Sequence, residues 1–452
     1  MYQVLLIPNI TWQKDIDKDS YVNVISDIIR ELNSVRNDLF WHCPLSSYSS
    51  LLSFPNVSQY IISMPSYPNA MRGHFNYEEW KNIINWRNKD FDLVYSHLPE
   101  WTLNVSNLLN NITNIKDIPI VGYTHWTEIK EVSTYSKTFI MNNINGLLEM
   151  RECGVNTIAQ KNLILENVRH LYSNEVINQL ERILQPHYLG IPNDASVDNI
   201  CTDTEKIIAF PHRPQAYKDF PHFISIMDSL WNIRKDFKVW VPLLDSPNRE
   251  YVDTTSYNTK DGYYKHLHKC RCCYCPKQVY AGWSVSGTDA LMNGVPVIHY
   301  NSDYYDELFQ NKQVSHTTDE EALELFNRIL DDKEYRDSIA REALILSKEK
   351  LVWKERIKPI HKMICDALDS TRPASEKSKK KDDILNFVLE NKMVSKSDIL
   401  KHMNWGVSIG FTSYRKFLLS QKNIITTMKN GIEYYTIDGE DTTVTQTFED
   451  FF

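Results

Sequence analysis

Short apolar runs alternate with amphipathic stretches over most of the chain. The first run, Gln3–Pro8, is followed by Tyr21–Leu32, whose apolar residues recur with helical spacing. Four further apolar runs come before residue 124: Leu39–Cys43, Gln59–Met64, Phe91–Ser96 and Ile118–Tyr123. Strands that alternate with helices are typical of a doubly wound parallel sheet, so the pattern predicts an α/β fold.

A break at Gln185–Pro192 divides this pattern into two parts. The segment QPHYLGIP holds two prolines and a glycine, and we interpret it as the crossing between two domains. After it come a strand at Lys206–Phe210, a helix at Phe223–Ile233 and a strand at Lys238–Pro242. The sequence therefore predicts two Rossmann-like domains, 1–190 and 191–368.

Three loops of the first domain follow predicted strands, where ligands of such sheets bind. They are Asn9–Trp12, Ser96–Glu100 and Thr124–Glu128. The last two loops each carry a histidine and a glutamate three residues apart, His125 with Glu128 and His97 with Glu100. A transfer to a hydroxyl group needs a base that takes the proton, and either side chain can serve. These four residues are candidate catalytic groups, with hydrogen-bonded loop residues as the alternative interpretation.

One loop of the second domain carries two cations. Arg213 and Lys218 follow the strand Lys206–Phe210, and cations at the end of a strand would face the diphosphate of a ligand. A guanidinium offers a fixed fork of donors, whereas an ammonium acts as a point charge. A solvated basic loop is the alternative interpretation.

Small residues in the stretch Ala281–Leu308 lead into a short helix, which is expected to start at Asp289 and stop at Gly294. The small residues nearest that helix are Ser286, Gly287 and Thr288. Free backbone N–H groups at a helix start suit a phosphate, and Asp289 could accept hydrogen bonds from sugar hydroxyls. The alternative is an ordinary loop–helix–strand segment of an α/β sheet.

The order S-x-x-G-x-D-A-L-x-x-G-x-P-V-I over Ser284–Ile298 resembles the donor-binding segment of GT-B glycosyltransferases. In that family the acidic residue, here Asp289, holds the ribose of a nucleotide sugar. Arg213 and Lys218 resemble the Arg/Lys pair with which GT-B enzymes stabilise the departing diphosphate. Many retaining members carry a second acid at the position of Ala281, so this departure leaves the stereochemical outcome open.

The GT-B resemblance also implies an architecture and a cofactor requirement. The two domains would face a central cleft, and the last helices would cross back to the first domain near Lys350–Ile357. No cofactor is required, because side-chain cations can replace Mg²⁺, although a Mg²⁺-assisted reaction is compatible with the family.

Composition limits the location and the partners of the chain. With 452 residues, 42% of them hydrophobic and 24% charged, the chain suggests a soluble protein of two or three domains. No apolar run approaches the roughly 20 residues that span a membrane. The N-terminus lacks the basic start of a signal peptide, so we expect a cytoplasmic protein that binds no membrane. The net charge of −8 argues against a nucleic-acid coat protein but allows a local basic face.

Four of the eight cysteines crowd into Cys270–Cys275, shortly after His266 and His268. A cluster of this kind can bind zinc. However, no second cysteine pair lies at zinc-finger spacing, and the segment falls where a GT-B chain places a buried strand. Buried reduced thiols are therefore expected, and no metal site is assigned.

The C-terminal part changes character at Asp369–Lys381, a polar segment rich in Ser and Lys that we interpret as a flexible linker. Three amphipathic helices and a hairpin are predicted beyond it: Asp382–Glu390, Ser395–Met403, Ser408–Ser420, and strands Ile424–Thr427 and Glu433–Ile437. This order resembles a winged helix-turn-helix over 382–437. The acidic residues 438–452 are expected to form a mobile tail.

The same module carries a local excess of positive charge. Residues 376–437 contain 11 Lys/Arg against 6 Asp/Glu, which suits DNA phosphates. The side chains expected to face DNA are Ser408, Thr412, Ser413, Arg415 and Lys416 on the third helix and Lys429 on the wing. A winged helix that binds protein is the alternative.

The combination of GT-B domains and a winged helix resembles bacteriophage glycosyltransferases that modify hydroxymethylated pyrimidines. That resemblance implies a hexosyl- or pentosyltransferase that uses UDP-glucose or a similar donor in the host cytoplasm. Its acceptor would be the hydroxymethyl group of 5-hydroxymethylcytosine or 5-hydroxymethyluracil in double-stranded DNA, with the base extruded. One alternative is a transferase for an envelope glycan, a protein or tRNA. Another is a DNA-binding regulator that senses a nucleotide sugar.

Overall fold

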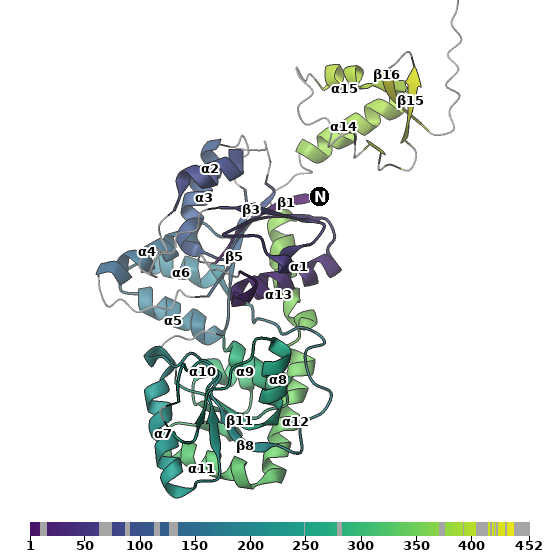
Figure 1. Cartoon of the computed structure of the whole chain (residues 1–452). Helices are drawn as coiled ribbons and strands as arrows, with labels where there is room; N and C mark the ends of the chain where they lie inside the picture. Colours follow the sequence, from purple (N-terminus) through teal and green to yellow (C-terminus); the bar gives the residue numbers. More distant parts are fainter. Residues whose placement is uncertain are drawn as a thin grey trace, which may run out of the picture. The chain divides into compact units, whose positions relative to one another are not determined.

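The computed structural model describes most of the chain in two units, Met1–Thr371 and Arg372–Phe452 (Figure 1). The described residues are 1–9, 16–62, 75–85, 91–112, 118–125, 134–247, 249–277, 283–369, 376–391, 393–403, 415, 418–419, 421, 424–429 and 432–437.

A seven-stranded parallel sheet forms the first half of the larger unit, in the order β3-β2-β1-β4-β5-β6-β7. Its strands are β1 (Tyr2–Ile7), β2 (Leu39–Leu45), β3 (Val57–Ile61), β4 (Leu93–Ser96), β5 (Ile120–Thr124), β6 (Glu152–Val155) and β7 (Leu184–Pro186). Residues 4–7 of β1 are fully buried, because both faces of a parallel sheet are covered. The strand order reverses between β1 and β4.

In the described residues up to 190, several helices accompany the first sheet. They are α1 (Ser20–Val35), α2 (Tyr77–Asn85), α3 (Pro99–Ile112), α4 (Thr134–Leu148), α5 (Ile158–Val168) and α6 (Asn174–Ile183), with 3₁₀ turns at Ile16–Lys18 and Ser50–Leu52. Asp19 caps α1, since its carboxylate accepts a hydrogen bond from Tyr21 N at 2.7 Å.

A six-stranded parallel sheet forms the second half, in the order β10-β9-β8-β11-β12-β13. Its strands are β8 (Glu205–Ala209), β9 (Lys238–Trp240), β10 (Val252–Asp253), β11 (Cys270–Cys275), β12 (Val297–Tyr300) and β13 (Ser315–His316). Its helices are α7 (Phe220–Ile233), α8 (Lys260–Lys269), α9 (Val285–Met292), α10 (Asp303–Phe309), α11 (Asp319–Asp331) and α12 (Lys333–Lys350), with 3₁₀ turns at Ala216–Lys218 and Lys312–Val314. Here the order reverses between β8 and β11.

Side chains of the second sheet alternate between two cores. Ile208 and Cys272 pack with α7 and α11, whereas Ile207 and Cys273 pack with α8, α9 and α12. The predicted α/β fold with two Rossmann-like halves is therefore confirmed.

The last helix of the larger unit, α13 (Trp353–Asp369), returns to the first half, as the family resemblance implied. Its buried residues, among them Trp353 and Ile360, belong to the core of the first sheet. The crossing is fixed where Ile191 N donates to Leu351 O at 2.8 Å and Trp353 N donates to Ile191 O at 2.9 Å. A Cβ at Gly190 would collide with the Trp353 ring, which explains the glycine.

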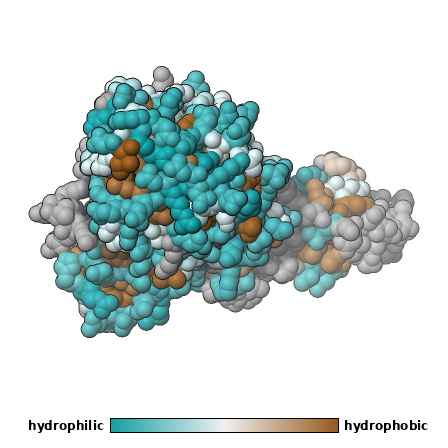
Figure 2. All heavy atoms as spheres, turned by 90° about the horizontal axis from the view of Figure 1, so that it is seen from below, coloured by the Kyte–Doolittle hydropathy of each residue, from teal (hydrophilic) through white to brown (hydrophobic). Residues whose placement is uncertain are grey.

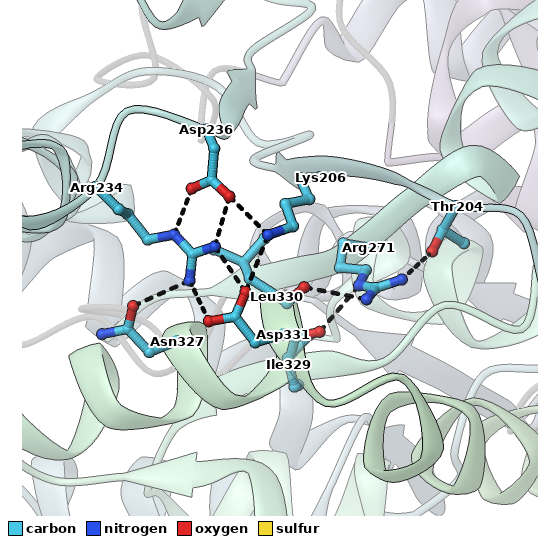
Figure 3. Close-up of polar contacts among 9 residues, drawn as sticks. All are labelled: Thr204, Lys206, Arg234, Asp236, Arg271, Asn327, Ile329, Leu330 and Asp331. Carbon is cyan, nitrogen blue, oxygen red and sulfur yellow. Dashed lines mark hydrogen bonds and ion pairs between the residues drawn. The ribbon is translucent and has the colours of Figure 1, made fainter.

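A charged network lies at the edge of the second sheet where its strands begin, opposite to the edge formed by their carboxyl ends (Figure 3). Arg234 pairs with Asp236 and Asp331, and Lys206 pairs with the same two carboxylates. Hydrogen bonds from Arg234 and Lys206 lower the pKa of Asp331 to about 2. Since ligands of such sheets bind at the other edge, we interpret this network as structural.

The described residues of the smaller unit form α14 (Glu376–Asn391), β14 (Met393–Ser395), α15 (Lys396–His402), β15 (Ile424–Lys429) and β16 (Ile432–Ile437). Its antiparallel sheet has the order β14-β16-β15. The predicted cap at Ser395 is confirmed, because Asp398 N donates to Ser395 Oγ at 3.2 Å and Ser395 N donates to Asp398 Oδ2 at 2.9 Å. The hairpin also forms, with Lys429 opposite Ile432.

The linker 369–381 was expected to be flexible throughout, but α14 already begins at Glu376, because Lys and Glu favour the helix. Most of the predicted third helix, 408–420, and the whole tail, 438–452, lie outside the described residues.

On the face drawn in Figure 2, hydrophilic atoms predominate and hydrophobic atoms form small, scattered patches. Single exposed apolar side chains such as Ile233 and Leu243 are normal for a protein surface. Within the described ranges, no helix combines the length and the apolar character needed to cross a bilayer.

Candidate functional site

Strands β8 and β11 of the second sheet lie side by side at the point where the strand order reverses. The segments that follow them are in contact. Ser286 Oγ donates a hydrogen bond to Pro211 O at 2.9 Å, and His212 Nε2 lies 3.0 Å from Tyr274 O. The two segments predicted to bind a phosphorylated ligand therefore meet at one sheet edge, where ligands of doubly wound folds bind.

Helix α9 starts earlier than the sequence suggested. The predicted start at Asp289 is wrong, because Ser284 caps the helix by accepting from Gly287 N at 3.1 Å and the helix begins at Val285. Asp289 thus lies in the second turn. The predicted end is confirmed, since Gly294 has φ 63°, a conformation that favours glycine.

The three small residues of α9 have structural roles of their own. A Cβ at Gly287 would lie 2.6 Å from Cζ of Phe309, so this glycine lets α10 pack closely. The buried Thr288 donates its hydroxyl proton to Val285 O at 2.9 Å. Any phosphate contact by this segment would therefore come mainly from backbone N–H groups of the first turn.

Asp289 is partly buried beside helix α8. Tyr264 Oη lies 3.4 Å from its carboxylate. Burial raises the pKa of Asp289 to about 7, and Lys260 and Tyr264 oppose this rise. Lys260 and Tyr264 stand one helical turn apart on α8, and sequence analysis missed both, although their i, i+4 spacing places them on one face.

Arg213 and Lys218 both lie after β8, as predicted. Arg213 is exposed, and among the described residues its guanidinium has no hydrogen-bond or ion-pair partner. Lys218 closes the 3₁₀ turn Ala216–Lys218, with its ammonium 5.5 Å from the centre of the Tyr217 ring. Both residues follow the carboxyl end of β8, the edge at which ligands of doubly wound sheets bind.

In the first half, the two predicted histidines lie together. His97 follows β4 and His125 follows β5, and His97 Nδ1 lies 3.3 Å from His125 Nε2. His97 is buried, and among the described residues its Nε2 has no hydrogen-bond partner. Burial, and then the neighbouring His125, lowers the pKa of His97 well below its usual value. This lowered pKa keeps the His97 imidazole neutral and disfavours its protonation.

Aromatic rings surround this histidine pair. The ring of Tyr123 stacks on His97 at 5.7 Å and lies 4.8 Å from His125, and Tyr21 and Tyr95 contact the His97 ring edge-on. Sequence analysis did not single out these tyrosines, although Tyr95 and Tyr123 stand near the ends of predicted strands.

The two predicted glutamates differ in their placement. Glu100 is buried in the first turn of α3, where the helix dipole favours a carboxylate. Glu128 lies outside the described residues.

The cysteine cluster lies on β11, as expected, and all four thiols are buried. Both neighbouring histidines have other partners, since His266 Nδ1 lies 2.9 Å from Tyr257 Oη and His268 Nδ1 lies 2.8 Å from Asn293 O. In the part of the chain that the structure describes, no three side chains are grouped to hold a metal ion.

Of the predicted DNA-binding residues, the structure describes Arg415 and Lys429. Arg415 forms a bidentate pair with Glu433, with nitrogen–oxygen distances of 2.6 and 3.1 Å. Lys429 is exposed at the end of β15. The other four, Ser408, Thr412, Ser413 and Lys416, lie outside the described residues.

The structure is similar to several solved structures, although no protein-family model and no curated protein matches the sequence. Anabaena Alr3699/HepE in complex with UDP aligns with a TM-score of 0.57 at 11% identity, over 82% of this chain and 100% of that chain. TarM aligns with a TM-score of 0.57 at 10% identity, over 82% and 99%. The N-terminal domain of Candida albicans trehalose-6-phosphate phosphatase aligns with a TM-score of 0.59 at 11% identity, over 82% and 97%.

With so few identical residues, these likenesses concern the fold. They agree with the strand orders, which reverse once in each of two parallel sheets. The chain thus has the GT-B architecture of two Rossmann-like domains, with a small additional C-terminal unit.

Proposed function

We propose that this protein is a glycosyltransferase that uses a UDP-sugar donor. The observation that carries the proposal is the contact between Ser286 and Pro211, which joins the Arg213 loop to the start of α9 at the reversal point of the second sheet. The Anabaena structures of this fold that contain UDP and UDP-glucose support a donor of this class.

Each side chain takes one role in the proposed reaction. Asp289, as the carboxylate, accepts hydrogen bonds from the ribose hydroxyls. Arg213 and Lys218 offset the negative charge that develops on the diphosphate as the bond between the anomeric carbon and the phosphate oxygen breaks. These cations allow the reaction to proceed without Mg²⁺.

The acceptor is deprotonated by the histidine pair of the first half. The partly exposed His125 takes the proton from the acceptor hydroxyl while the hydroxyl oxygen attacks the anomeric carbon. The neutral His97 holds His125 through the 3.3 Å contact between their ring nitrogens.

We further propose that the acceptor is a hydroxymethylated base in double-stranded DNA. The described elements of the smaller unit follow the order α14-β14-α15-β15-β16, with β16 between β14 and β15, and this order supports the winged-helix interpretation. The excess of positive charge over 376–437 supports nucleic-acid binding. Arg415 and Lys429 are the described residues among those predicted to bind DNA. Because Arg415 pairs with Glu433, Lys429 is the one that we propose for a phosphate contact.

Transfer of radiolabelled glucose from UDP-glucose to DNA tests both proposals. We expect label on duplexes that contain 5-hydroxymethylcytosine or 5-hydroxymethyluracil and none on unmodified duplexes, with and without EDTA. Hydrolysis of UDP-glucose without transfer would support the donor site but contradict the DNA acceptor. Binding of UDP without any turnover would instead favour a DNA-binding regulator that senses nucleotide sugars.

A further inference from the structure

Glu307 on α10, in the second half, reaches the start of α5 in the first half. Its carboxylate accepts hydrogen bonds from Ile158 N and Ala159 N, both at 2.8 Å, and from Tyr188 Oη at 2.9 Å. The first N–H groups of a helix have no partner within the helix, and its dipole favours a negative charge there. One carboxylate thus satisfies two such groups across the boundary between the halves.

Tyr188 extends this contact toward the segment Ser284–Ile298, which resembles a donor-binding segment and is called the donor segment below. Its ring lies 6.3 Å from the ring of Trp283, which directly precedes Ser284, the cap of α9. Burial, and then Glu307, raises the pKa of Tyr188 to about 12, so the phenol remains a hydrogen-bond donor. The guanidinium of Arg356 lies 4.8 Å from the centre of the same ring.

The other end of the contact leads to the histidine pair. Asn156 lies two residues before α5, and Tyr123 Oη lies 2.9 Å from Asn156 Oδ1 and 2.7 Å from His187 O. The Tyr123 ring in turn lies 4.8 Å from that of His125. Packed and hydrogen-bonded side chains therefore connect the donor segment with the candidate base.

We propose that Glu307 is a positioning residue that sets the separation between the donor segment and the His97–His125 pair. Helix α5 follows β6 and α10 follows β12, so the contact joins the ligand-binding edges of the two sheets. Three hydrogen bonds to one carboxylate tolerate little displacement, because their strength falls steeply with distance and angle. The catalytic consequence rests on the proposed function, whereas the contact itself does not.

Hydrogen exchange of the full-length protein without ligand tests the contact. In Glu307→Ala, the amides of Ile158 and Ala159 should exchange roughly 10- to 100-fold faster than in the wild type. The matched control Glu324→Ala removes an exposed glutamate from the middle of α11 and should leave both amides unchanged. Equal exchange in the wild type and Glu307→Ala would overturn the proposal.

Tyr188→Phe provides a second, milder variant, because it removes one hydrogen bond and leaves both amides paired with Glu307. It should leave the exchange of Ile158 and Ala159 within about threefold of the wild type. A larger acceleration, equal to that of Glu307→Ala, would show that Tyr188 and not the carboxylate fixes the contact, which contradicts the proposal.

Turnover of UDP-glucose then tests the positioning role. Glu307→Ala should lower kcat by roughly tenfold or more while the affinity for UDP stays within about twofold of the wild type. Loss of UDP affinity with unchanged kcat would indicate local damage to the donor segment and would refute positioning. Absence of turnover in the wild type would defeat the proposed function, and the exchange experiment would still decide the contact.

Discussion

The substitution Asp289→Asn tests whether the carboxyl group of α9 is held in an environment that disfavours its charge. Burial is the largest influence on this group, and it raises the pKa from 3.8 to about 7. The folded protein therefore binds the proton more tightly than the unfolded chain. Stability is lost as the pH rises from about 4 to about 7, because folding then opposes ionisation. Asparagine keeps the shape and removes this dependence.

The magnitude follows from the same two values. The pKa of Asp289 rises by about three, and at 1.36 kcal/mol per pKa unit this lowers the free energy of unfolding by ~4 kcal/mol above pH 7. Water reaches part of the side chain, so we expect about half of this destabilisation, ~2 kcal/mol, at pH 8. At pH 5.5 the expected gain from Asp289→Asn is ~1 kcal/mol, and near pH 4 it vanishes.

Urea unfolding of both proteins, followed by tryptophan fluorescence at pH 5.5 and pH 8, measures this difference. The midpoint of Asp289→Asn should exceed that of the wild type, and the gap should widen with pH. A gap that is independent of pH, or a variant that is less stable at pH 8, would refute the reasoning. The variant should also bind UDP roughly tenfold more weakly at pH 8, because a charged hydrogen-bond acceptor is lost.

Three further predictions concern other parts of the larger unit. Arg213→Ala should lower kcat for UDP-glucose roughly 100-fold while DNA affinity is retained, as measured by turnover and gel-shift assays. A variant that turns over as fast as the wild type would exclude Arg213 from the mechanism. His125→Ala should reduce kcat roughly 100-fold or more while UDP binding is preserved, as measured by kinetics and calorimetry. A loss confined to UDP binding would contradict the role of His125 as the base. Arg234→Ala should cost ~1 kcal/mol at neutral pH in low salt, because its partners Asp236 and Asp331 are more than half exposed. That contribution should shrink as the pH falls from about 4 toward 2, because Asp331 is then partly protonated while Asp236, whose pKa is lowered further, still pairs with Arg234. An effect that stays constant over this range in urea unfolding would contradict an ion-pair origin.

The class of fold and many of its strands and helices could be predicted from the sequence alone. Residues 4–7 are buried on both faces of a parallel sheet, and such strands appear in a sequence as uninterrupted apolar runs. The ends of some helices could also be predicted from a few neighbouring residues. Ser395 with Asp398, three residues later, marks the cap of α15, and Gly294 marks the end of α9 through its positive φ.

Which loops share an edge of the sheet depends on the three-dimensional arrangement of the strands. The pattern of the chain gives the succession of strands but not their order in the sheet, which brings His97 beside His125 and Ser286 beside Pro211. Pairings between residues far apart in sequence settle that order, and no short window of sequence contains them.

Tertiary contacts also decided the properties of single site residues. Phe309 explains Gly287, which the sequence motif assigned to phosphate binding, and Glu433 engages Arg415, which was expected to face DNA. The raised pKa of Asp289 has the same origin, because it depends on burial beside α8. The residue type defines which chemistry is available. The partners and the solvent exposure of the residue determine which part of that chemistry it can perform, and both are set by packing between distant segments.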